Sequence, residues 1–145
     1  MIHRILSLLL AFACAALASP REDATALVQD AAKFVQAQGL EKALPELNKP
    51  DGKWVKGDLY VFAYDLKGIM VAHPKNVKLV GKNMLDIPDV DGKLFRREIL
   101  DIAKSKGTGW VDYKYKNPET GKVEPKTTYL KKVGDIVLCC GIYLE

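Results

Sequence analysis

A group of aromatic and cationic side chains, carried on segments with strand-like alternation, has the greatest capacity for ligand chemistry in this sequence. A buried tyrosine hydroxyl needs a hydrogen-bond partner, which a polar ligand can supply. A lysine ammonium can neutralise a ligand carboxylate as a point charge. Two simpler interpretations stay open: sheet aromatics can merely pack against helices, and Lys126, which follows Pro125, could be an exposed strand-end lysine. The group comprises Tyr60, Phe62, Trp110, Tyr113, Tyr115, Lys126, Tyr129 and Tyr143.

Motifs for catalysis are weak in comparison. Once residues 1–18 are set aside, His73 is the one histidine, and any Ser-His-Asp or Cys-His triad would have to use it. Neither a Gly-x-Ser-x-Gly elbow nor a phosphate-binding Gly-x-x-x-x-Gly-Lys-Ser/Thr loop occurs. Asp86, Asp89 and Asp91 resemble a fragment of a calcium loop, but the bidentate glutamate is missing, so turn formation and helix capping are favoured. We therefore expect no enzyme, no cofactor and no metal site.

The elements that must position these side chains follow from hydrophobic periodicity. Helical spacing predicts a long helix over 25–38, a short one over 40–47 that Pro45 weakens, and a third that Asp91 caps and Gly107 ends. The segment 75–90 has no clear period and is interpreted as a long connector, which in a compact domain is often functional. The expected strands are 59–64, 69–72, 109–116, 126–133 and 136–144.

Hairpin links between these strands predict an α+β fold with an antiparallel five-stranded sheet. The N-terminal helix would cover one face of the sheet, and the helix-containing connector at 74–107 the other. A ligand cavity would lie beneath that connector. The composition agrees with one folded domain, because 48% of the 145 residues are hydrophobic. The net charge of +4 is not concentrated in a basic block, so no nucleic-acid partner is expected.

The first residues have the layout of a secretory signal peptide. A short basic start at 1–4 precedes an almost wholly apolar run at 5–15, and the small residues of Ala16-Leu17-Ala18 follow. We expect a cleaved signal peptide over 1–18 and one mature domain over 19–145. The apolar run is too short for a transmembrane anchor, and no second run of spanning length follows, so no membrane span is expected after cleavage. The mature protein is then periplasmic or secreted.

Two further alternatives concern the cysteines. A lipoprotein signal ending at Cys14 is not favoured, because Ala11 stands three residues before it where a leucine-like residue is usual. Cys139 and Cys140 are adjacent on an expected strand, so their side chains point to opposite faces. A disulfide between them is geometrically unfavourable. We expect an exported domain that relies on its core rather than on disulfides.

The order of these segments resembles the single Cache family (type 2 single Cache) of extracytoplasmic sensor domains. The resemblance spans almost the whole mature chain. It is carried by GDLYVF at 57–62, the turn at 65–68 with VAHP at 71–74, GKN at 81–83, DVDGK at 89–93, GWVDY at 109–113, PKTTY at 125–129 and GIY at 141–143. Each segment alone is weak, but seven in the right order are specific.

This resemblance implies a PAS-like fold and a ligand such as pyruvate, lactate, acetate, another short carboxylate or a similar metabolite. It places Tyr60, His73, Tyr113 and Lys126 in the pocket. It assigns Trp110, Tyr115 and Tyr129 to the pocket with weaker support. Regular strand alternation would put Lys126 and Tyr129 on opposite faces, so both can line one pocket only if the strand bends.

The sequence also departs from the family pattern. Chemoreceptors and sensor kinases of this family carry flanking membrane helices and a cytoplasmic output module, neither of which is recognisable here. We therefore expect an exported ligand-binding protein that docks to a separate membrane-bound signalling partner. The alternative is a structural or protein-interaction module of the same fold with a degenerate pocket. Cys139-Cys140 also stands where small residues usually precede the closing Gly-Ile-Tyr.

Overall fold

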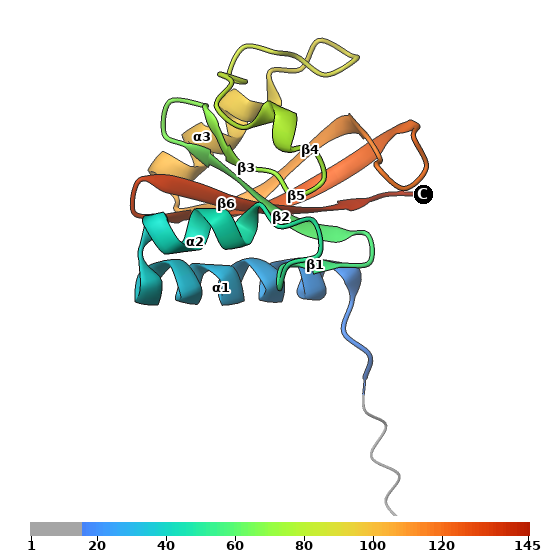
Figure 1. The fold of residues 1–145 in the computed structure, drawn as a ribbon. Helices are drawn as coiled ribbons and strands as arrows, with labels where there is room; N and C mark the ends of the chain where they lie inside the picture. The colour runs from blue at the N-terminus through green and yellow to red at the C-terminus, as the bar shows by residue number, and fades with distance from the viewer. Residues whose placement is uncertain (1–15) are drawn as a thin grey trace, which may run out of the picture.

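The computed structural model describes residues 16–145, so residues 1–15 of the expected signal peptide lie outside the described part. A central antiparallel sheet separates two helical layers, with α1 and α2 on one side and α3 on the other (Figure 1). The expected α+β fold is confirmed. The elements are α1 Pro20–Gln38, α2 Leu40–Leu47, β1 Val55–Lys56, β2 Leu59–Asp65, β3 Met70–Ala72, η1 Val77–Leu79, α3 Phe95–Ser105, β4 Thr108–Lys116, β5 Val123–Val133 and β6 Ile136–Tyr143.

Helix α1 begins at Pro20, five residues before the predicted start. The Ser19 hydroxyl accepts the backbone N–H of Glu22 at 3.2 Å, and a proline at the first helical position already has the required φ. Gly39 ends the helix with a φ of 79°, which a side chain disfavours. The buried face of the helix, including Leu27 and Val28, packs on the sheet. No helix among residues 16–145 is long and apolar enough to cross a membrane.

The sheet has six strands in the order β1-β2-β6-β5-β4, with β3 paired to β2. The additional strand is β1, which has only two residues and is too short to produce a periodic pattern. Strand β6 lies between β2 and β5 and is antiparallel to both. Because β6 is central, its side chains contribute to the layers on both faces.

Strand β5 begins at Val123 rather than at the predicted residue 126, so Lys126 lies inside the strand. Lys126 pairs with Tyr113 of β4 on one side and with Tyr143 of β6 on the other. The register is continuous along β5, so the strand has no bulge that would bring Lys126 and Tyr129 onto one face. The interpretation of Lys126 as an exposed strand-end residue is wrong: its exposed fraction is 1%.

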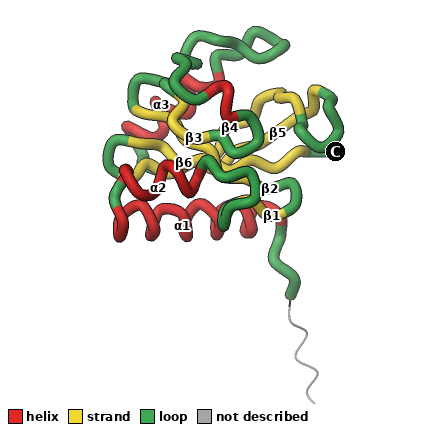
Figure 2. Tube along the Cα trace, in the orientation of Figure 1, coloured by secondary structure: helices red, strands yellow, loops and turns green. Residues whose placement is uncertain are grey.

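The long connector and α3 cover the face of the sheet opposite α1, as predicted (Figure 2). The expected Asp91 cap is wrong, because α3 begins at Phe95 with Leu94 at its N-cap and no side-chain cap. Asp91 instead pairs with Lys114 of β4 at 2.9 Å. Asp89 accepts the backbone N–H of Lys114 at 3.0 Å, and three such backbone bonds lower the pKa of its carboxyl. These acids tie the connector to the sheet.

Two hydrophobic cores result, one beneath α1 and one beneath α3. Cys140 belongs to the first core and Cys139 to the second, and both thiols are free and fully buried. Burial raises the pKa of Cys140 to about 12, so its thiol stays protonated near neutral pH.

We predict that neither Cys139 nor Cys140 reacts with an alkylating reagent in the native protein, because both are enclosed by the core. In denaturant without reductant, both are expected to react. Intact mass spectrometry would then give two added labels on the 19–145 chain. A chain that takes no label in denaturant and is two hydrogens lighter would instead reveal a disulfide.

Candidate ligand-binding site

Lys126 lies in an aromatic cage on the α3 side of the sheet. Its Nζ donates a hydrogen bond to the Tyr60 hydroxyl at 3.0 Å. Among residues 16–145, no carboxylate forms an ion pair with it. The ring centroids that surround Nζ are those of Tyr60 at 4.8 Å, Phe62 at 5.0 Å, Tyr115 at 5.1 Å and Tyr143 at 4.9 Å.

Burial lowers the pKa of Lys126 from its ordinary value near 10.5 to about 7, and the nearby Arg96 contributes in the same direction. The amine is therefore close to half protonated at neutral pH. A buried ammonium without a carboxylate is unfavourable unless another group compensates its charge. The aromatic faces offer part of that compensation through cation–π attraction. An anionic ligand at Nζ would supply the rest and would return the amine to its charged form.

The hydroxyl groups around the cage are arranged as hydrogen-bond donors. Tyr60 accepts from Lys126, and its own O–H donates to the Tyr143 oxygen across a long 3.5 Å. Tyr143 donates to the Lys116 carbonyl at 3.1 Å. Burial raises the pKa of Tyr60 far above its ordinary value and that of Tyr143 to about 12. Both hydroxyls therefore stay protonated under physiological conditions.

His73 adds a neutral donor to the same face. Its Nδ1 accepts the backbone N–H of Asn76 at 2.9 Å, which leaves Nε2 as the protonated ring nitrogen. Burial, followed by the charge of Lys126, lowers the pKa of His73 to about 3, so the ring stays neutral. The ring is held 5.2 Å from that of Tyr60, and the Asn48 side chain accepts the His73 backbone N–H at 2.9 Å.

Tyr113 and Tyr115 come from alternate positions of β4 and share this face. The Tyr113 hydroxyl lies 2.8 Å from that of Thr128, and its ring stacks on Phe95 with centroids 3.9 Å apart. The Tyr115 ring meets the Tyr113 ring edge-on. Burial raises the pKa of both tyrosines, so both are donors rather than phenolates.

These side chains enclose a narrow cavity between the sheet and α3. The gaps between them are too narrow for a water molecule. An open groove of about 480 Å³ adjoins it and shares His73 and Tyr115 with its lining. Those two side chains thus stand between the cavity and solvent. The cavity is lined by Phe62, Tyr64, Met70, His73, Phe95, Tyr113, Tyr115 and Lys126.

The structure brings five of the seven sequence-predicted site residues together: Tyr60, His73, Tyr113, Tyr115 and Lys126. It places the other two elsewhere. Trp110 and Tyr129 contact each other with ring centroids 5.4 Å apart in the core beneath α1.

Several lining residues were not predicted as site residues. Phe62 and Tyr64 follow Tyr60 at intervals of two, so strand alternation alone could have assigned them to the same face. Met70 begins β3 and Phe95 begins α3, and no sequence motif marked either residue as part of the pocket.

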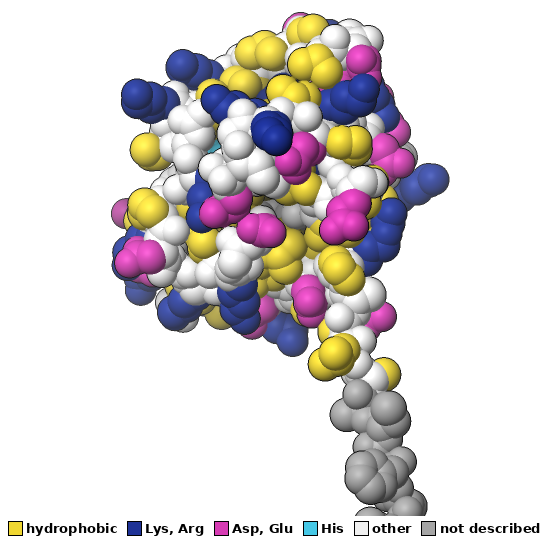
Figure 3. All heavy atoms as spheres, turned by 90° about the vertical axis from the view of Figure 1, so that its right-hand side faces the viewer, with side chains coloured by type: hydrophobic (Ala, Val, Ile, Leu, Met, Phe, Trp, Pro, Cys, Tyr) yellow, Lys and Arg dark blue, Asp and Glu magenta, His cyan; other side chains and the backbone are white. Residues whose placement is uncertain are grey.

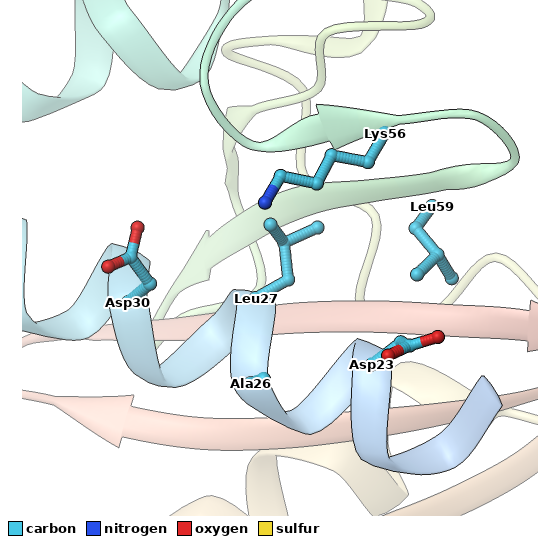
Figure 4. Close-up of a pocket in the computed structure, with 6 residues that line it drawn as sticks. All are labelled: Asp23, Ala26, Leu27, Asp30, Lys56 and Leu59. Atoms are coloured by element: carbon cyan, nitrogen blue, oxygen red, sulfur yellow. The ribbon is translucent and has the colours of Figure 1, made fainter. Parts of the chain in front are cut away.

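A larger groove of about 600 Å³ lies between α1 and the β1–β2 hairpin (Figure 4). Asp23 and Asp30 line it from α1, and Lys56 extends over it from β1. These three charged groups are exposed, and Asp30 already accepts the Trp54 indole N–H at 3.0 Å. Solvent compensates such charges, so this groove lacks the buried, unpaired group that distinguishes the Lys126 cavity. Basic and acidic side chains are likewise interspersed on the face in Figure 3.

The sequence profile described as Single Cache domain 2 matches residues 22–145, nearly all of the described structure. The chain belongs to this family. This Cache domain is 33% identical over 90 residues to the sensor histidine kinase MctS of Rhizobium johnstonii. It is 29% identical over 90 residues to the methyl-accepting chemotaxis protein McpP of Pseudomonas putida. Both matches cover 61% of this chain but only 19% and 16% of those proteins, so the chain spans less than a fifth of either relative.

Solved structures agree with this assignment. One is a Cache chemosensory domain described as giving the structural basis for carboxylic acid recognition; it is 28% identical, with a TM-score of 0.73 over 86% of this chain and 92% of that chain. A periplasmic sensor domain of a chemotaxis protein is 26% identical, with a TM-score of 0.69 over 86% and 90%. A Vibrio parahaemolyticus methyl-accepting chemotaxis protein, at 23% identity and a TM-score of 0.74 over 86% and 88%, shares the fold. This Cache domain is thus a sensor-type module.

Gly141 gives a direct test of how closely the Cache cavity is fitted around Lys126. A Cβ at this position would lie under 3.0 Å from Cε of Lys126 and from Oγ1 of Thr128, closer than real Cβ atoms approach. We predict that Gly141→Ala displaces the Lys126 side chain and weakens binding of a ligand in this cavity by at least about tenfold.

A matched control for this variant is Gly109→Ala, another strand glycine whose added Cβ would crowd Ile102. It is expected to lower stability without changing affinity. Calorimetric titration together with urea unfolding of both variants separates the two effects. Equal affinities for Gly141→Ala and the parent protein would contradict the prediction.

Proposed function

We propose that this domain is a non-catalytic, exported sensor module that binds a short carboxylate such as pyruvate, lactate or acetate, or a similar metabolite. The observation that carries the proposal is the buried Lys126 amine, which has no carboxylate partner among residues 16–145 and is surrounded by hydrogen-bond donors. A small acid offers little apolar area, so its affinity must come from charge-assisted hydrogen bonds in a site that excludes water.

In this proposal Lys126 anchors the ligand carboxylate. The hydroxyl groups of Tyr60 and Tyr115 and the Nε2–H of His73 donate to its oxygens, while Tyr113 shapes the wall beneath α3. The neutral state of His73 and the protonated states of the tyrosines suit them to donate. Trp110 and Tyr129 would support the opposite face of the sheet instead of touching the ligand.

The comparison that supports this ligand class is the Cache chemosensory domain described in terms of carboxylic acid recognition. The alternative, an interaction module with a degenerate pocket, is favoured by one observation: the gaps in the cavity do not admit water. The two functions differ in a simple property, namely whether any small molecule stabilises the folded protein.

A thermal-shift screen of the 19–145 protein against short carboxylates is the test. A ligand that binds only the folded state stabilises it by RT ln(1 + [L]/Kd), or about 2.7 kcal/mol at a hundredfold excess over Kd. We expect at least one acid to raise Tm, and its uncharged amide, such as lactamide for lactate, to have no effect. If no carboxylate shifts Tm more than its amide does, the degenerate-pocket alternative is supported instead.

We further propose that the domain acts outside the cytoplasm, next to a membrane-bound signalling partner, as the receptors in which related domains occur suggest. The basic start, apolar run and small residues at 16–18 predict cleavage before Ser19. N-terminal sequencing of the protein recovered from the periplasm or medium should therefore begin at or near Ser19. Exported protein that still begins at Met1 would contradict this.

A further inference from the structure

Arg96 is a second buried cation, placed on the α3 side of the same cavity. Its exposed fraction is 3%, its Nε donates to the Tyr64 hydroxyl at 3.0 Å, and its Nη1 donates to the Ile87 carbonyl at 3.0 Å. The guanidinium carbon lies 4.2 Å from the ring centroid of Phe95 and 6.0 Å from those of Tyr64 and Tyr115. All three rings line the cavity, so Arg96 stands directly behind its wall.

Among the described residues, no hydrogen-bond partner of Arg96 carries a negative charge. Within residues 16–145 it forms no ion pair, whereas the adjacent Arg97 donates from Nε to the Asp86 carboxylate at 2.7 Å on the exposed side of α3. The exposed Arg97 is therefore paired with a carboxylate, whereas the buried Arg96 contacts neutral hydrogen-bond acceptors and the faces of aromatic rings. An arginine cannot lose its proton in a protein, so its buried charge persists.

Lys126 and Arg96 both lie next to the same cavity. Lys126 lies 5.1 Å and Arg96 6.0 Å from the Tyr115 ring centroid, on which both are positioned as cation–π partners. Both charges also lower the pKa of His73, which lines the same cavity. A carboxylate bound to Lys126 alone would leave the charge of Arg96 uncompensated. A ligand with a second negative group would compensate both.

We propose that the ligand of this site is a short dicarboxylate, with one carboxylate on Lys126 and the other on Arg96; the Tyr115 ring tilts away from the guanidinium while its hydroxyl still faces the first carboxylate. The proposal rests on the proposed carboxylate-sensing function and specifies its ligand class. The planar guanidinium matches a carboxylate with paired N–H donors, so Arg96 sets specificity for the second carboxylate.

The test compares acids of equal chain length by calorimetry at pH 7 with the 19–145 protein. Malonate is paired with propionate, and succinate with butyrate. We expect one dicarboxylate to bind at least about tenfold tighter than its monocarboxylate counterpart. Arg96→Gln should remove this preference and leave the affinity for the monocarboxylate within about threefold, whereas the matched variant Arg97→Gln should keep the preference.

The outcomes distinguish this inference from the proposed function. If monocarboxylates bind as tightly as dicarboxylates, or if Arg96→Gln keeps the preference, the dicarboxylate assignment is overturned while carboxylate sensing stands. If no acid binds at all, the proposed function fails as well. Arg96→Lys, which retains the charge, provides a second variant if Arg96→Gln does not fold, and it is expected to keep part of the preference. A full loss of preference in Arg97→Gln would equally contradict the assignment to Arg96.

Discussion

Lys126→Met is expected to remove measurable carboxylate binding and to leave the protein at least as stable as the wild type. Loss of one partner of a buried charge pair typically costs about 2–5 kcal/mol, which corresponds to a loss of affinity of about 30-fold or more. Methionine preserves the packing of the lysine stem inside the aromatic cage. Without a ligand the buried amine is a destabilising group, so its removal relieves the folded state.

The stability effect has a defined pH dependence. The pKa of Lys126 falls from an ordinary value near 10.5 to about 7 on folding. Between these two pH values the unfolded chain therefore binds more protons than the folded protein. As a result, the contribution of Lys126 to the free energy of unfolding of the wild type becomes more favourable as pH increases from 7 to 10.5. The advantage of Lys126→Met should be largest at or below pH 7, with an upper limit of about 5 kcal/mol, and should shrink toward pH 10.

Urea unfolding at several pH values, combined with calorimetric titration, measures both parts of this prediction. Tyr129→Phe is the control, since it removes a hydroxyl from the opposite face of the sheet. It should bind the ligand within about twofold of the wild type. A Lys126→Met protein that binds the acid normally would show that this lysine is not the anchor.

The second large effect concerns the pH dependence of binding itself. In the proposed function a carboxylate binds the ammonium form of Lys126, and the free protein loses that form as pH rises through about 7. Affinity is therefore expected to be highest near pH 6, where the lysine is charged and the ligand is still ionised, and to fall about tenfold per pH unit above 7. Binding at pH 8 should then take up close to one proton.

The other titratable groups near Lys126 do not obscure this titration. The pKa of His73 is about 3, that of Tyr143 about 12 and that of Cys140 about 12, and the pKa values of Tyr60, Tyr113, Tyr115 and Cys139 are also raised by burial. Within residues 16–145, Lys126 is thus the titratable group at this cavity whose pKa lies near neutrality. Titrations in buffers of different ionisation enthalpy count the protons taken up. A flat affinity from pH 7 to 9 would mean that the amine stays charged in the free protein.

Local sequence patterns predicted most of the fold, because the periodicity of a helix or strand depends on residues that are close together in the chain. The alternation of 59–64 and the apolar spacing of Phe95, Ile99 and Ala103 each produced the correct element. The strand β1 and the start of α3 were missed for a related reason. Strand β1 has only two residues, which is too few to show a periodicity. Asp91 was expected to cap α3, but it forms an ion pair with Lys114, which becomes its neighbour only after folding.

The family resemblance, not strand alternation, assigned Tyr60, Tyr113 and Lys126 to the pocket, because these residues lie on three different strands whose faces only the register relates. Alternation within β5 does separate Tyr129 from Lys126. Arg96 shows the limit of this approach. A helical wheel places it with Leu100 and Ala103 on the buried side, but next to Arg97 it is easily taken for part of an exposed basic pair. Only the packed structure distinguishes the two arginines.

The narrowness of the cavity has a consequence for the rate of sensing. The gaps do not admit a water molecule, and His73 and Tyr115 separate them from the adjoining groove. A ligand can therefore bind only to a minor open conformation, and the apparent Kd equals the intrinsic Kd divided by the fraction of molecules in that conformation. At high ligand concentration the association rate should level off at the opening rate. The domain would then report the average concentration of its ligand over the opening time, and faster fluctuations would pass undetected.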